Sequence, residues 1–374
     1  MGKPGATALM RNLRSEQKIM QDWRLDPTKP LVSVWCLTYN HESYIEDALE
    51  GFLIQETDFP FEILIHDDAS TDRTANIIQE YEARYPNLIK PIYQTENQYS
   101  KGNQPELFNS KRAKGEYIAL CEGDDYWIDA KKLQKQVDFL QRNSEFGLVH
   151  TDCNFFYQQT GKFEKNVNHN LMKSNELINY NSHFSSKDLF LYLILGKYRI
   201  RTATVLYRAI FIKSIPSNPI LFLMRDTPLW LDLSQITIFY YLDEITTVYR
   251  VLNGSASHPI NIKSFLRFKL SESEMRIHYC FKYCYSIPKY TQRRYNDSLL
   301  KYITFDRLYI PYYSLIQPSL LTSLYYNVIK FSHLFRQTIK FYYSIRFNIH
   351  TKQIITAFKR CFYSIIKLYK SDKK

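Results

Sequence analysis

Short apolar runs alternate with segments of helical periodicity through the first 150 residues. Five runs rich in Val, Ile, Leu and Phe have the length of buried strands, at 31–37, 61–65, 89–94, 116–121 and 146–150. Between them, apolar residues recur every three or four positions and predict helices at 45–53, 74–85 and 133–140. We expect Ser43 to cap the first helix, with Glu46 three residues on, and one of residues 70–72 to cap the second. This alternation predicts an α/β fold whose mostly parallel sheet is flanked by helices.

The pattern changes twice along the chain. Residues 1–30 read as a polar helix and a Pro-punctuated linker, and residues 31–257 form the predicted catalytic domain. Its later part is mixed, with an amphipathic run at 189–195 and strand-like runs at 202–207 and 245–251. Residues 258–374 are helical in pattern, aromatic and basic, which predicts a C-terminal extension without internal repeats.

The positive charge of the chain is concentrated in that extension. The whole chain has a formal net charge of +12, yet residues 261–374 contain 21 Lys and Arg against 5 Asp and Glu. Segments 325–343 and 354–369 mix aromatic and basic residues, as helices at an anionic membrane surface do. The alternative is a helical bundle that packs its aromatic face on the catalytic domain. Nucleic-acid binding is less favoured, because no reader motif accompanies the charge.

Other features bear on the compartment. The six cysteines lack metal-ligand or disulfide-framework spacing, which favours a reducing compartment. The first 26 residues are polar, so no signal peptide is expected, and no run of 18 apolar residues is present. We therefore expect a cytoplasmic protein, either free or peripheral on the inner face of the plasma membrane.

Acidic residues follow two of the predicted strands. Glu122, Asp124 and Asp125 come directly after the fourth strand, and Asp67 and Asp68 end the second. Ligands of open α/β sheets bind beyond the carboxyl ends of the strands. Neighbouring carboxylates repel each other unless a cation lies between them, and Mg²⁺ or Mn²⁺ in nucleotide sites is held by one or two carboxylates plus phosphate oxygens. Helix capping is the alternative explanation for each acidic group.

Three strand ends, taken together, carry a resemblance to a known family. They are LVSVWCLTYN at 31–40, FEILIHDDASTD at 61–72 and KGEYIALCEGDD at 114–125. Their order and spacing resemble the family 2 glycosyltransferases of the GT-A fold, a Rossmann-like fold, of the bacterial surface-polysaccharide type. The resemblance extends over roughly residues 30–251. It implies a nucleotide-diphospho-sugar donor, a divalent metal and inversion at the anomeric carbon.

The resemblance also implies roles for individual residues. It places Asp124 and Asp125 at the metal and diphosphate, with Glu122 where the family usually has Asp. The expected donor-binding residues are Thr38, Tyr39, Asn40, Glu42, Asp68, Lys101, Glu122, Asp124 and Arg250. A carboxylate such as Asp68 could accept the N–H of a pyrimidine, so UDP-sugars are favoured. Arg250 could reach the diphosphate or form a structural ion pair.

An inverting transferase also needs a base on the acceptor side. The family carries it as an acid at the start of a helix downstream of the metal site, and Asp226, followed by Pro228, fits this description. Arg225 stands where the family usually has Glu. His41, His66 and His150 lack metal-ligand spacing, and we expect ordinary polar loop residues there.

Two alternatives remain open. A nucleotidyltransferase would carry a Gly-rich phosphate loop near the first strand, and residues 31–40 have none. A catalytically degenerate domain could instead serve as a binding module at the membrane surface. The favoured hypothesis is a metal-dependent inverting glycosyltransferase with a saccharide or lipid-linked saccharide acceptor.

Overall fold

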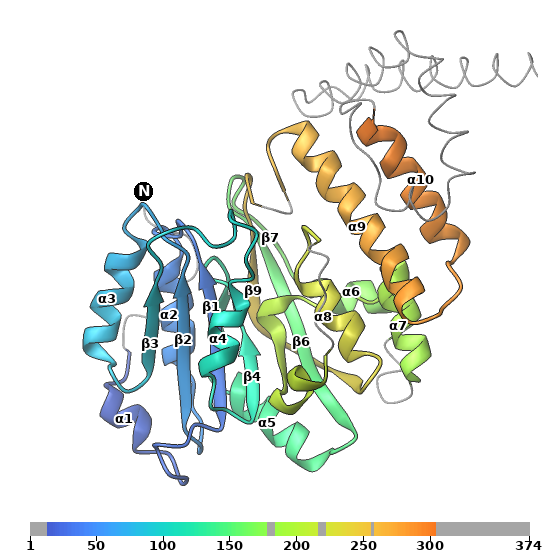
Figure 1. Cartoon of the computed structure of the whole chain (residues 1–374). Coiled ribbons are helices and arrows are strands. Elements are labelled where there is room, and N and C mark those ends of the chain that lie inside the picture. Colours follow the sequence, from blue (N-terminus) through green and yellow to red (C-terminus); the bar gives the residue numbers. More distant parts are fainter. Residues whose placement is uncertain (1–12, 178–183, 216–221, 256–257, 304–374) are drawn as a thin grey trace, which may run out of the picture. The chain divides into compact units, whose positions relative to one another are not determined.

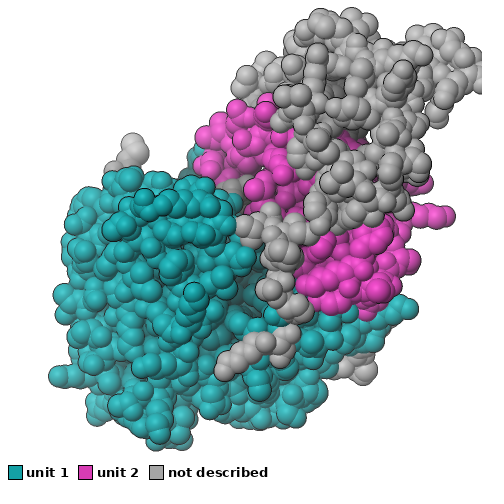
Figure 2. All heavy atoms as spheres, viewed as in Figure 1, with its two compact units in different colours: residues 1–221, 225–252 teal, residues 222–224, 253–374 magenta. Residues whose placement is uncertain are grey.

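The structure is a computed structural model that describes residues 13–177, 184–215, 222–255 and 258–303. The chain divides into two compact units (Figure 2). Unit 1 comprises residues 1–221 and 225–252, and unit 2 comprises residues 222–224 and 253–374. The predicted boundary after residue 257 stays a prediction.

Unit 1 is built around one nine-stranded sheet. Its strands are β1 (Val32–Thr38), β2 (Phe61–Asp67), β3 (Ile89–Tyr93), β4 (Tyr117–Leu120), β5 (Tyr126–Trp127), β6 (Phe146–Tyr157), β7 (Lys162–Glu164), β8 (Val205–Arg208) and β9 (Ile238–Val251). The helices are α1 (Glu16–Met20), α2 (Ile45–Leu53), α3 (Thr74–Arg84), α4 (Glu106–Arg112), α5 (Lys132–Arg142), α6 (Val167–Ser174), α7 (Ser186–Leu195) and α8 (Asp226–Leu233), with 3-10 turns η2 (Thr202–Thr204) and η3 (Ala209–Ser214).

The strand order is β3-β2-β1-β4-β8-β6-β9-β5, and β7 pairs with β6 (Figure 1). Strands β3, β2, β1 and β4 are mutually parallel, and the long β6 and β9 are parallel to each other. Strand β8 joins the two groups and runs antiparallel to both neighbours. The expected α/β class, with a mostly parallel sheet flanked by helices, is confirmed.

This strand order brings the predicted acidic turns together. Strand β1 lies between β2 and β4 and is parallel to both, so the carboxyl ends of all three strands meet at one edge. Thr38 is the register partner of Asp67. The Gly123 N–H donates to the Leu37 carbonyl at 2.9 Å, which extends this adjacency into the turn after β4. Both polar turns and the end of β1 therefore border the same surface.

The core forms where apolar faces of helices cover the sheet. In α2, residues at positions 45, 48, 49, 52 and 53 are fully buried and share one cluster with alternate residues of β1. Burying such side chains stabilises the fold by roughly 1.5–3 kcal/mol each. The same helical spacing was visible in the sequence, so the packing follows directly from the pattern.

Three local predictions are corrected by the structure. Helix α2 is preceded by Tyr44 and has no side-chain cap, so the predicted Ser43 cap is wrong. The histidines at 66 and 150 are not loop residues, because both are fully buried within strands β2 and β6. Helix α3 is likewise preceded by Arg73 and has no side-chain cap, so the predicted cap by one of residues 70–72 is wrong, although Asp72 Oδ1 accepts the Thr74 N–H at 2.9 Å.

Unit 2 contains helices α9 (Ile262–Lys282) and α10 (Lys289–Ile303), which pack on each other. Burial alone would raise the pKa of Glu272, but Arg276, Lys269 and Arg294 surround it and lower that pKa to about 2. The predicted membrane segments 325–343 and 354–369 lie outside the described residues. Within the described ranges, no helix is both long and apolar enough to span a bilayer.

Candidate active site

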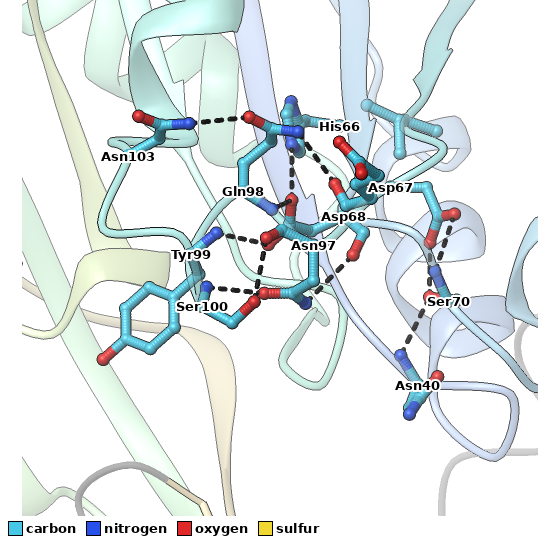
Figure 3. Close-up of polar contacts among 12 residues, drawn as sticks. Asn40, His66, Asp67, Asp68, Ser70, Asn97, Gln98, Tyr99, Ser100 and Asn103 are labelled. Carbon is cyan, nitrogen blue, oxygen red and sulfur yellow. Dashed lines mark hydrogen bonds and ion pairs between the residues drawn. The ribbon is translucent and has the colours of Figure 1, made fainter.

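The turn after β2 is anchored by the loop that follows β3 (Figure 3). The Asp68 carboxylate accepts the backbone N–H of Gln98 at 2.7 Å and that of Tyr99 at 3.0 Å. The Asn97 side chain donates to the Asp68 carbonyl at 3.0 Å. Asp68 is 5% exposed, and these hydrogen bonds fix the loop at 97–99 beside the strand ends. Its predicted role with the base stays a prediction.

The end of β1 is clamped to the turn before α3. Asn40 has a positive φ of 55°, and its Oδ1 accepts the Thr71 N–H at 2.8 Å. Glu42 Oε2 accepts the Arg73 N–H at 3.0 Å. Through these hydrogen bonds the side chains of Asn40 and Glu42 stabilise the turn before α3. Their expected contacts with the donor stay predictions.

Tyr39 and Thr38 stand at the same strand end but differ in accessibility. Tyr39 is 44% exposed, which suits a ring that stacks on a base. Thr38 is 3% exposed, and its Oγ1 is buried without a hydrogen-bond partner. A Cβ on Gly123 would lie 2.7 Å from this oxygen, so the turn after β4 needs glycine to approach β1 this closely.

Glu122 and Asp124 lie in a turn that concentrates negative charge. Burial, together with the charges of Asp124 and Asp226, raises the pKa of Glu122 to about 8. The Asp125 N–H closes the turn on the Glu122 carbonyl at 3.1 Å. The charge of Asp226 thus reaches the Glu122 carboxyl, so the start of α8 lies within electrostatic range of the acidic turn. The metal and base roles of these residues stay predictions.

Asp125 is turned toward the protein interior. It is 2% exposed, and its Oδ1 accepts the Arg250 N–H at 2.7 Å. The Arg250 guanidinium donates to the Asp124 carbonyl at 2.8 Å and pairs with Asp47 at 2.6 Å. Of the two roles considered for Arg250, the structure thus shows the structural ion pair. Arg250 also holds the acidic turn in place. The metal role expected for Asp125 stays a prediction.

Asp226 is the first residue of α8, as expected for the base. Its Oδ1 accepts the Thr227 N–H at 2.6 Å and the Thr227 hydroxyl at 3.2 Å. Burial raises the pKa of Asp226, while the Thr227 N–H and the positive charge of Arg201 oppose this rise. A carboxylate with a raised pKa is a better proton acceptor near neutral pH.

Lys101 and Arg225 lie on the loop side of the site. Lys101 forms an ion pair with Glu96, and both side chains are exposed. Arg225, which replaces the usual acid before Asp226, lies over the Tyr99 ring at 5.4 Å and 3.8 Å from Glu106. A donor-binding role of Lys101 stays a prediction.

The carboxylates of the turn fit a hard divalent cation. Glu122 and Asp124 are both partly exposed, and their repulsion is what a cation would relieve. Among the described residues, no group of three or more His, Cys, Asp or Glu is arranged to hold a metal. In Mg²⁺ or Mn²⁺ sites that bind nucleotides, substrate phosphate oxygens and water supply the remaining ligands.

The sequence analysis missed three contributors to the site. Asp47 lies on α2 among apolar positions, and nothing in the pattern marked it as the partner of Arg250. Thr202 lowers the pKa of Glu122 and the charge of Arg201 lowers that of Asp226, although both residues precede a strand far along the chain. Only the pairing of β8 between β4 and β6 brings them here.

Comparisons with known proteins agree with this geometry. The sequence model of the glycosyl transferase family 2 matches residues 33–211. An uncharacterised protein from Mycobacterium tuberculosis (strain ATCC 25618 / H37Rv) is 46% identical over 131 residues, which are 35% of this chain and 37% of that protein. The putative teichuronic acid biosynthesis glycosyltransferase TuaG from Bacillus subtilis (strain 168) is 38% identical over 116 residues, 31% of this chain and 44% of TuaG.

A third relative is the poly(ribitol-phosphate) beta-N-acetylglucosaminyltransferase TarS from Staphylococcus aureus (strain Mu50 / ATCC 700699). It is 32% identical over 114 residues, 30% of this chain and 19% of TarS. A crystal structure of S. aureus TarS 1-349 shares 18% identity with a TM-score of 0.46, and the match covers 76% of each chain. The chain matches between 19% and 44% of the length of these curated relatives.

Proposed function

We propose that the chain transfers a sugar from a nucleotide-diphospho-sugar to a hydroxyl group, as the match of residues 33–211 to the glycosyl transferase family 2 model supports. The transfer inverts the anomeric carbon. The acceptor is a saccharide or lipid-linked saccharide of a bacterial surface polymer, in keeping with the names of TuaG and TarS. The donor is a UDP-sugar, for which Tyr39 supplies the stacking surface.

One observation supports this proposal most strongly. The pKa of Glu122 depends on burial and on the charges of both Asp124 and Asp226, although α8 begins about a hundred residues after the acidic turn. Three carboxylates that lie close together can bind a cation. They can also accept a proton from a hydroxyl group that attacks the sugar. A purely structural turn gains nothing from this repulsion.

Each residue has a distinct task in the proposed reaction. Asp226 takes the proton of the acceptor hydroxyl through the oxygen that Thr227 leaves unbound. The acceptor oxygen forms its bond to the anomeric carbon as the bond to phosphate breaks, and that electron pair leaves with the diphosphate. Glu122 and Asp124 would hold the divalent cation, and Arg250 fixes the turn through Asp125. The bound cation would neutralise the departing nucleoside diphosphate.

The direct test is a donor screen with the full chain. UDP-, GDP- and CMP-linked sugars are incubated with Mn²⁺ or Mg²⁺, and released nucleotide is measured with and without saccharide acceptors. We expect metal-dependent hydrolysis of a UDP-sugar that acceptor accelerates. Nucleotide binding without any turnover across the panel would favour a binding module instead.

Asp226→Asn then tests the base. We expect transfer to fall by about 10²–10⁴-fold, the usual contribution of a general base, with the donor Kd within twofold of the wild type. Glu145→Gln is the matched control, because Glu145 is exposed and lies outside the site. Transfer by Asp226→Asn at the wild-type rate would remove Asp226 from the mechanism.

A further inference from the structure

Arg201 occupies an aromatic platform beside the candidate base. It immediately precedes η2, and its guanidinium carbon lies 4.8 Å from the Phe155 ring centroid and 5.5 Å from that of Tyr249. Phe155 and Tyr249 are register partners on β6 and β9, which run side by side (Figure 1), and their rings are 4.9 Å apart. Stacking on two neighbouring rings fixes the plane of the guanidinium.

Arg201 forms no direct ion pair in the part of the chain that the structure describes. Within the described ranges, no carboxylate oxygen lies within 4.0 Å of its side-chain nitrogens. Its Nε is buried and has no hydrogen-bond acceptor. The Nε of Arg250 is also buried without an acceptor, but its terminal nitrogens donate to the Asp124 carbonyl and pair with Asp47. A buried donor without an acceptor is costly, and an arginine in this state is suited to an anion that arrives with a ligand.

The position of Arg201 places that anion on the acceptor side. Its positive charge acts on Asp226, the group that faces the attacking hydroxyl. The carbonyl of Ala203, two residues after Arg201, accepts the Trp127 Nε1–H at 2.8 Å, so η2 lies against β5, the strand that follows the acidic turn.

We propose that Arg201, held on Phe155 and Tyr249, binds an anionic group of the acceptor, a phosphate or a carboxylate, beside the hydroxyl that reacts. The inference rests on the proposed function for the identity of the acceptor side. A planar guanidinium binds either oxyanion through two parallel hydrogen bonds, which orients the acceptor as well as attracting it. The same chemistry could serve the donor diphosphate, and the experiment separates the two sources.

The test measures anion binding while the donor subsite is filled. The full chain is saturated with UDP and Mn²⁺, and binding of radiolabelled inorganic phosphate is followed by equilibrium dialysis. Binding of glucuronate and glucose is followed by saturation-transfer NMR. We expect phosphate and glucuronate to bind alongside UDP and glucose to bind more weakly. Arg201→Gln should weaken both anions about 10–100-fold, the range of charge-assisted hydrogen bonds, and leave UDP affinity unchanged.

Two further variants sharpen the result. Arg201→Lys keeps the charge but loses the parallel pair of donors, so it should recover only part of the affinity. Arg142→Gln is the control, since Arg142 is an exposed cation paired only with Asp138 on α5. Anion binding that UDP abolishes, or that Arg201→Gln leaves intact, would overturn the proposal. A wild type that binds the anions but no nucleotide would refute the proposed function and leave an Arg201 anion site standing.

Discussion

Replacing Glu122 with glutamine should change how the stability of the chain depends on pH. Burial and the charges of Asp124 and Asp226 raise the pKa of Glu122 from 4.5 to about 8. At about 1.36 kcal/mol per pKa unit, ionising this group in the folded chain costs up to about 5 kcal/mol. Glu122 is partly exposed, and solvent screening reduces this to about 2 kcal/mol.

The sign follows from the raised pKa. The folded chain holds this proton more tightly than the unfolded chain, so stability falls as pH rises from about 4.5 toward 8. Glutamine cannot ionise and removes this loss. The melting temperature of Glu122→Gln relative to wild type should therefore increase by about 4 °C between pH 5.5 and pH 8.5, measured by differential scanning fluorimetry with a chelator.

Added Mn²⁺ provides the second half of the test. At pH 8.5 it should raise the melting temperature of the wild type, because a cation offsets the repulsion that ionised Glu122 causes, and it should raise that of Glu122→Gln by less. Glu145→Gln should follow the wild type throughout. Parallel pH curves for the wild type and Glu122→Gln, or equal stabilisation of both by Mn²⁺, would refute the electrostatic reasoning.

Two further predictions concern the residues that support the site. Arg250→Gln leaves the Asp47 carboxylate buried and unpaired and should lower the unfolding free energy, measured by urea unfolding, by about 3–5 kcal/mol. Adding Asp47→Asn should restore part of that free energy. Strictly additive losses in the double variant would contradict the pairing. Asp68→Asn places an amide donor against the N–H of Gln98 or Tyr99. It should accelerate hydrogen exchange of both backbone amides and weaken UDP binding about tenfold, an effect within the range of about 1–3 kcal/mol. Unaltered exchange would show that Asp68 does not anchor the loop.

The sequence predicted the placement of strands and helices around the candidate site where the pattern is local. Apolar runs that end in acidic residues marked β2 and β4, and the alternation of strands with helices predicted that their carboxyl ends share an edge. The start of α8 at Asp226 was visible from Pro228 and the apolar run after it. These features depend on residues that are close in the chain, where periodicity and turn chemistry are informative.

What the sequence by itself determined was therefore the α/β class and the meeting of Asp68, Glu122 and Asp124 at one sheet edge. The tertiary structure alone decided which charges act together. Asp125 looked equivalent to Asp124, yet Arg250 and Asp47, which lie more than two hundred residues apart, turn it inward. Arg201 gained its place only because β8 inserts between β4 and β6. Such pairings depend on long-range strand order and burial, and no periodicity along the chain encodes them.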